Sequence, residues 1–173
     1  MNGSTALSPP GTSNLAPSLV CAQSLWKQGT SELNKRTGGV RESGAFLLGK
    51  KEGKCRRITR IVYYDDLDSH CFDQGIVNFD GGKFGLLWEI CRNEGLEVMA
   101  DVHVHARSFG QSQSDRDHPM MPLAGHLAVV LPNYAANNVM PGRIGLYEYL
   151  GDGKWTDHSR EGTNYFRLDP PSP

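Results

Sequence analysis

The feature that most constrains how this chain can fold is a strand-like segment that leads into His103-Val104-His105. Residues 96–102 alternate apolar and other side chains, which predicts a β-strand that runs directly into the histidines. Side chains two residues apart on a strand leave the same face, roughly 6.6 Å apart along it. The two imidazoles can therefore converge on one ion, and neutral imidazole is a common ligand of zinc.

A Ser-x-x-Asp motif follows the histidines within one loop and supplies a carboxylate. Ser112 and Asp115 form this motif, and a second copy, Ser114 and Asp117, overlaps it. In either copy the serine hydroxyl can cap a helical turn, with the aspartate three residues later on the same side. Two imidazoles and one carboxylate are typical of an open, catalytic zinc site rather than a closed structural one.

Length, charge and cysteine content limit the possible functions. A chain of 173 residues can bury a hydrophobic core of its own, so we expect one domain that does not need a metal ion or disulfide bonds to fold. The net charge is −1 and no long basic run occurs, which argues against a nucleic-acid ligand. The sequence has no C-x-x-C pair, no apolar run of membrane-spanning length and no signal-peptide pattern at its N-terminus. We therefore expect reduced cysteines, no membrane partner and a cytoplasmic location.

Apolar spacing predicts helices and strands between two polar ends. We expect residues 1–17 to form a flexible tail, 18–168 to form the domain, and the proline-rich residues 169–173 to fray. The patterns predict helices over 18–36 and from Asp80 to Gly95, a hairpin of strands at 45–48 and 57–64, and further strands over 96–105, 126–131 and 143–150. Helices and strands alternate, so the expected class is α/β (α+β) around one sheet.

Three separated pieces of the sequence resemble, in order, the JAMM (JAB/MPN) metallopeptidase family. They are Arg41 to Gly49, in which Glu42 begins a Glu-x-x-x-x-Leu-x-Gly pattern, then the His-x-His strand, then the Ser-x-x-Asp motif. The resemblance covers about residues 18–158 and implies a single MPN-type domain, a mixed curved sheet flanked by helices. Gly110-Gln111 and the segment around His118 look most like the bacterial members, which are often encoded beside ubiquitin-like proteins and their E1-like and E2-like enzymes.

The resemblance also implies a reaction. It indicates a zinc-dependent isopeptidase or peptidase that cleaves after the C-terminus of a ubiquitin-like protein, in deconjugation or in precursor processing. Under this interpretation His103, His105 and Asp115 bind zinc, Glu42 is the general base and Ser112 steadies the oxyanion. Such a ligand set leaves zinc with net positive charge, which lowers the pKa of its bound water to about 7.

The sequence leaves the register of the third ligand and the exact function open. The loop that ends at Ser112 is one residue shorter than the spacing common in the family, and the copy at Ser114 and Asp117 is one residue longer. The Gly110-Gln111 lead-in favours the first copy, so Asp117 is the alternative ligand. The alternative functions are a zinc hydrolase that processes a sulfur-carrier-like protein or a small amide, and a catalytically silent MPN scaffold that binds proteins.

Overall fold

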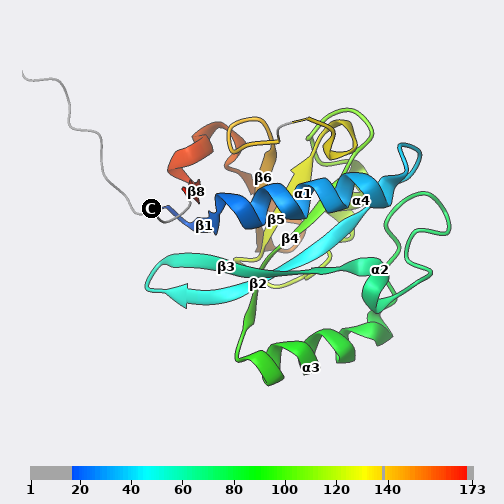
Figure 1. Cartoon of the computed structure of the whole chain (residues 1–173), viewed down its shortest axis with the longest axis horizontal. Coiled ribbons are helices and arrows are strands. Elements are labelled where there is room, and N and C mark those ends of the chain that lie inside the picture. Colours follow the sequence, from blue (N-terminus) through cyan, green and yellow to red (C-terminus); the bar gives the residue numbers. More distant parts are fainter. Residues whose placement is uncertain (1–16, 138, 171–173) are drawn as a thin grey trace, which may run out of the picture.

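The computed structural model describes residues 17–137 and 139–170, which form one curled mixed sheet with helices on both sides (Figure 1). The eight strands lie in the order β7-β6-β5-β4-β2-β3-β1-β8. The strands are β1 (Leu19–Ala22), β2 (Gly44–Glu52), β3 (Cys55–Tyr63), β4 (Glu97–Val104), β5 (Leu127–Leu131), β6 (Gly145–Gly151), β7 (Lys154–Asp157) and β8 (Phe166–Asp169). The helices are α1 (Gln23–Thr37), α2 (Tyr64–Leu67), α3 (Phe84–Glu94) and α4 (Gln113–Asp117), with 3-10 turns at Gly81–Lys83, Asn133–Ala135 and Ser159–Asn164.

The mixed α and β class is as predicted, and so are the β2–β3 hairpin and the α3 helix. The first predicted helix, 18–36, is wrong at its start, because Leu19–Ala22 form β1 and α1 begins at Gln23. The reason is burial: Leu19, Val20 and Cys21 are fully buried, and β1 pairs in parallel with both β3 and β8.

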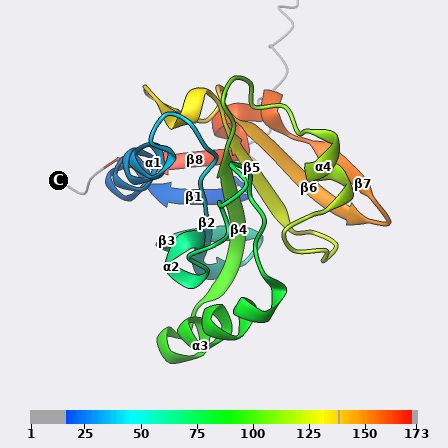
Figure 2. The same cartoon turned by 90° about the vertical axis from the view of Figure 1, so that its right-hand side faces the viewer.

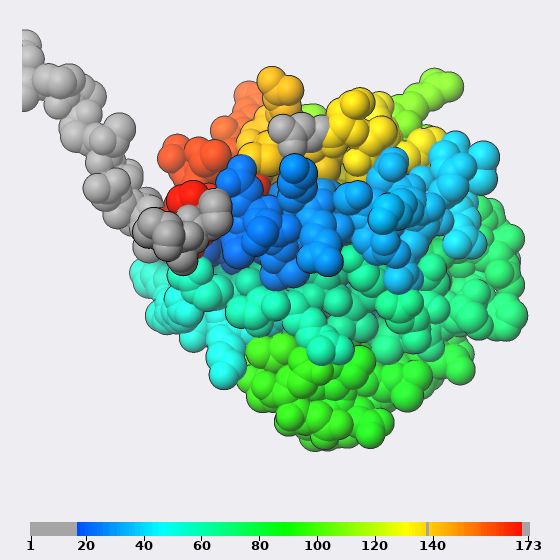
Figure 3. All heavy atoms as spheres, in the orientation of Figure 1, coloured from blue at the N-terminus to red at the C-terminus, as the bar shows by residue number. Residues whose placement is uncertain are grey.

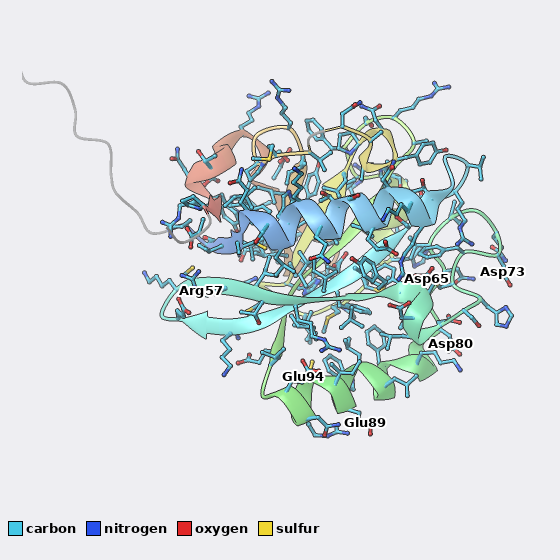
Figure 4. The ribbon with its side chains drawn as sticks, in the orientation of Figure 1. Arg57, Asp65, Asp73, Asp80, Glu89 and Glu94 are labelled. Carbon is cyan, nitrogen blue, oxygen red and sulfur yellow. The ribbon has the colours of Figure 1, made fainter. Side chains whose placement is uncertain are left out.

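The two ends of the chain lie mostly beyond the described residues. The flexible tail was expected over residues 1–17. Residues 1–16 lie outside the described ranges, and the description begins at Pro17. At the other end β8 continues to Asp169, whose carboxylate accepts a hydrogen bond of 3.0 Å from Arg57. Arg57 is labelled in Figure 4. Residue 169 is thus held in the sheet, and residues 171–173 lie outside the described ranges.

Helices α1 and α3 lie on opposite faces of the β2–β3 hairpin (Figures 1 and 3). The side chains of β2 alternate between the two faces, as in any strand. Leu47 packs in the same core cluster as Trp26 of α1, whereas Phe46 packs in the cluster that includes Leu87 of α3. Because both faces of β2 are covered, its sequence is apolar without a break from Ala45 to Leu48.

The turn between α3 and β4 sets the direction of the central strand. Gly95 adopts a left-handed conformation with φ of 62°, which glycine reaches without steric cost. Its N–H donates to the carbonyl of Arg92, and the N–H of Leu96 donates to the carbonyl of Cys91, so the helix ends in a Schellman motif. Strand β4 then runs antiparallel to β2 and parallel to β5, and both flanking strands hold its last residues in register.

Within the described residues, no helix has the length and apolar character needed to cross a membrane. The four cysteines are free thiols, and Cys21, Cys71 and Cys91 are buried.

Candidate metal centre

Three side chains converge at the end of β4. The Nε2 atoms of His103 and His105 are 3.0 Å apart, and the carboxylate of Asp115 lies 3.4 Å from the first and 3.2 Å from the second. One potential ligand atom from each residue falls within 4.8 Å of the others. His103 belongs to β4, His105 follows directly after it, and the aspartate comes from α4, which lies beside β7 (Figure 2). The folded chain therefore assembles two nitrogen donors and one oxygen donor.

His103 is fixed by the centre of the sheet. It pairs with Gly44 of β2 on one side and with Val130 of β5 on the other, and it is buried. Gly44 is required at this position, because an added Cβ would lie 2.3 Å from the ring of Tyr64 and 2.9 Å from the carbonyl oxygen of Val102. The backbone of β2 can thus approach closely beside the first histidine.

Asp115 is fixed by the start of α4. Ser112 is the N-cap, and its hydroxyl accepts a hydrogen bond of 3.1 Å from the N–H of Asp115. In return the Asp115 carboxylate accepts a hydrogen bond of 2.6 Å from the N–H of Ser112, which completes a capping box. The side chain of Asp117 is exposed and accepts a hydrogen bond from Gln113 instead. The structure therefore brings Asp115, and not Asp117, to the histidines.

Negative charge surrounds the histidines. Burial by itself lowers the pKa of His103, but the hydrogen bond and charge of Asp115, with the charges of Asp101 and Glu42, raise that pKa above its usual value. Burial acts in the opposite sense on Asp115, and the hydrogen bonds from His103 and His105 outweigh it, so the pKa of Asp115 lies well below its usual range. The site attracts positive charge, whether as protons or as a cation.

Glu42 lies just before β2, two residues ahead of the glycine that pairs with His103. One carboxylate oxygen accepts a hydrogen bond of 3.0 Å from the N–H of Val77, and the Glu42 N–H donates to the carbonyl of Gly75. Glu42 is therefore held by the segment that precedes α3, and its charge contributes to the raised pKa of His103. Ser112 is the N-cap of α4 and is hydrogen-bonded to Asp115.

The backbone around His105 is held by a left-handed turn that the sequence did not reveal. Asn133, Tyr134 and Ala135 have φ values of 52°, 54° and 54°, a conformation that costs non-glycine residues energy. The N–H of Tyr134 donates to the carbonyl of His105 at 2.8 Å, and the N–H of His105 donates to the carbonyl of Leu131. Strained backbone is often retained next to functional residues, and here it fixes the second histidine.

A buried polar group beside the site was also missed by sequence reasoning. Asp101 lies two residues before His103 on the same face of β4 and is 2% exposed. Its carboxylate accepts hydrogen bonds from the Nε2 side of His126 at 2.6 Å and from the Tyr64 hydroxyl at 3.3 Å. The Gly125-His126 pair was visible in the sequence, but its partner 25 residues earlier was not.

A cavity of about 250 Å³ opens directly beside this group and the metal-ligand candidates. His103, Asp115 and Asp101 line it together with aromatic side chains. The candidate centre therefore has adjoining space in which part of a substrate can lie.

The donor set fits a metal such as zinc. Nitrogen and oxygen donors suit Zn²⁺, and three protein ligands with one open position are the usual arrangement in catalytic zinc sites. The fit rests on the type and convergence of the donors, which come from His103, His105 and Asp115.

No protein-family model matches the chain. Among solved structures, the chain is similar to a protein from Desulfitobacterium hafniense, with a TM-score of 0.63 and 13% sequence identity over 88% of this chain and 94% of that one. It is also similar to a protein from Salinibacter ruber (strain DSM 13855), with a TM-score of 0.56 and 15% identity over 88% of this chain and 94% of that one. At such low identity, these similarities establish the fold alone.

Proposed function

We propose that this protein is a JAMM-type zinc hydrolase on an MPN-like domain, which cleaves the amide bond after the C-terminus of a ubiquitin-like protein. The observation that carries the proposal is the convergence of His103, His105 and Asp115 at the end of the central strand, beside a cavity. The order of these residues in the chain, with Glu42 ahead of them, agrees with the family pattern.

His103, His105 and Asp115 would hold the ion, since each presents a ligand atom to one point. Zinc bound there would supply Lewis acidity, which polarises a carbonyl oxygen and makes water a stronger nucleophile near neutral pH. The protein's part is to keep the three ligands in place and one position open.

Glu42 would act as the general base. Its carboxylate is oriented by the N–H of Val77, and its charge acts on His103. It would take a proton from the attacking water and deliver it to the amine that leaves, so that the net reaction is hydrolysis of one amide bond. Glu42 need not bind the metal for this role.

Ser112 would contribute in two ways. Its oxygen accepts the hydrogen bond that holds Asp115, and a hydroxyl group can accept and donate at the same time. The hydroxyl proton would then be available to an oxyanion that forms on the carbonyl carbon.

The proposed substrate is a ubiquitin-like protein joined to a lysine or to a C-terminal extension. E1-like and E2-like enzymes would be the upstream partners, and the cytoplasm the compartment, because the sequence has the pattern of bacterial members of such systems.

The test is cleavage of a ubiquitin-like protein fused at its C-terminus to a reporter. We expect the zinc-loaded protein to release the reporter after the last residue of the ubiquitin-like domain. A chelator should stop release, and added zinc should restore it. Zinc-loaded protein that cleaves no such fusion would contradict the proposed substrate class.

A further inference from the structure

The cavity beside the candidate metal centre has a distinctive lining. Aromatic side chains from three parts of the chain form its walls: Tyr64 at the start of α2, Phe79 and Phe84 around the start of α3, and Trp155 of β7. Asp101 and Asp115 both line the cavity, and none of the described lining residues is a lysine or an arginine. Aromatic faces and carboxylates both attract organic cations.

Asp101 is an almost completely buried residue that lines this cavity. Its side chain is 3% exposed, and it lies two residues before His103 on β4, which separates the two side chains by roughly 6.6 Å along the strand. His126 and Tyr64 each occupy one of its carboxylate oxygens. A carboxylate has about four acceptor positions, so Asp101 keeps the capacity to bind a further donor.

Carboxylates line the cavity without a nearby lysine or arginine among the described lining residues. Asp115 would be committed to the metal. Asp101, which pairs with His126 at 2.6 Å, is then the carboxylate left to face the rest of the cavity.

We propose that this cavity is a specificity pocket for a basic side chain of the substrate, with Asp101 as the residue that selects it. This inference rests on the proposed function, and it names the substrates that the site prefers: amides that carry an alkyl chain ending in a guanidinium or ammonium group next to the cleaved bond. The alkyl chain would lie between the rings of Phe84 and Trp155, and the cation would reach Asp101.

The size of the cavity agrees with this occupant. Pockets that enclose whole drug-sized ligands have volumes of about 300–1,000 Å³. At about 250 Å³ the cavity is smaller, so it suits one side chain rather than a complete small-molecule substrate. The rest of the substrate would lie outside it, across the metal ligands.

A purely structural role for Asp101 makes a different prediction. In that case the Asp101–His126 pair only ties β4 to the residue that precedes β5, and removal of the charge changes stability without changing which ligands bind. The experiment must therefore measure ligand preference as well as stability.

The test is a titration of zinc-loaded protein with n-butylguanidinium and with n-butylurea, its neutral isostere, followed by NMR or calorimetry. Neither probe is a good zinc ligand near neutral pH. We expect the guanidinium compound to bind at least tenfold more tightly to the wild type. Equal affinity for the two compounds would overturn the proposal, and this comparison requires no variant.

Asp101→Asn keeps the shape of the side chain and one acceptor oxygen, and it removes the charge by replacing the other oxygen with an amide NH2 group. We expect it to lose the preference for the cation, while Asp152→Asn, which removes the same charge from an exposed turn, keeps it. A preference that persists in Asp101→Asn would overturn the assignment. Tyr64→Phe retains the ring and serves as a second variant, with a smaller loss expected.

Binding and cleavage separate the two proposals. If the cation binds selectively but no ubiquitin-like fusion is cleaved, the proposed function fails and the pocket stands. If fusions are cleaved at the same rate with arginine as with citrulline beside the bond, the proposed function stands and the pocket assignment fails.

Discussion

The two sides of the candidate metal centre are built in different ways. His103 belongs to a central strand, is 9% exposed, and is held by main-chain pairing with β2 and β5. Asp115 belongs to a five-residue helix with no buried residues, and two hydrogen bonds with Ser112 hold it. The strand side depends on the whole sheet, whereas the α4 side depends on a few polar atoms.

This difference indicates which side of the site can open locally. Segments with few buried apolar contacts open at low free energy, whereas the core of a sheet opens only when the whole domain unfolds. We therefore expect changes on the α4 side to alter metal affinity with little effect on global stability. Changes on the strand side should alter both.

The largest effect should come from His103→Ala. This change removes a ligand and leaves a void in the sheet, so we expect loss of stoichiometric zinc, loss of cleavage and a lower free energy of unfolding. Metal analysis and a denaturant titration would measure both effects. His70→Ala is the control, because that side chain is 81% exposed and pairs with Asp73 on the outside of a loop (Figure 4). A His103→Ala protein with a full complement of zinc would refute the ligand assignment.

Asp115→Ala should also lose zinc and cleavage, but with a smaller effect on stability, because α4 packs little against the core. Asp117→Ala should retain most of its zinc and most of its cleavage activity, because the Asp117 carboxylate is hydrogen-bonded to Gln113. Zinc content and reporter release would be compared in the two variants. The reverse result would move the site to Ser114 and Asp117.

Glu42→Gln should keep the metal and lose turnover. The glutamine oxygen can still accept the hydrogen bond from Val77, so the local fold is retained while the base is removed. We expect cleavage to fall at least about 10²-fold, the lower end for positioned acid–base catalysis. Turnover close to that of the wild type would exclude Glu42 from the mechanism.

Ser112→Ala should weaken zinc binding moderately. Loss of an N-cap costs about 1 kcal/mol, so we expect about a fivefold loss in affinity, measured by competition with a chelator. Ser112→Asn is the matched variant, because asparagine also caps helices but has no hydroxyl to donate to an oxyanion. It should restore zinc affinity and not turnover. Equal metal affinity in Ser112→Ala and the wild type would show that the cap does not position Asp115.

The smallest effect should appear in the pH dependence of the metal-free protein. The raised pKa of His103 contributes stability below its usual value of 6.5, and this is lost as the pH rises through the higher folded value. The lowered pKa of Asp115 contributes stability above 3.8, lost only as the pH falls toward the lower folded value. We expect the metal-free wild type to lose stability as the pH rises above 6.5, and Asp115→Asn to lose less. Identical pH profiles would contradict a coupled pair.

Local patterns in the sequence predicted the parts of the fold that local interactions determine. The α3 helix, its glycine stop and the strand before the histidines follow from spacing and from Gly95. Strands β7 and β8 were not predicted, because each has four residues and gains its order from partners elsewhere in the chain. The apolar start of the predicted 18–36 segment likewise fits helix and strand equally well until β3 and β8 are in place.

The candidate site divides in the same way. The His-x-His and Ser-x-x-Asp motifs could be identified in the sequence because the residues of each motif are close together. Both copies of the Ser-x-x-Asp motif were compatible with a capped helix. The Gly110-Gln111 lead-in favoured Asp115 over Asp117, and the distances in the folded chain agree with that choice. The Asp101–His126 pair and the left-handed turn at Tyr134 depend on contacts between distant segments, so no local pattern announces them.

The most direct test of the account is X-ray absorption at the zinc edge on protein purified without chelator and loaded with one equivalent of zinc. We predict two imidazole nitrogens at about 2.0–2.1 Å and oxygen ligands at about 2.0–2.2 Å, with one imidazole lost in His105→Ala. Sulfur at about 2.3 Å, or failure to retain zinc at all, would show that His103, His105 and Asp115 are not a zinc site.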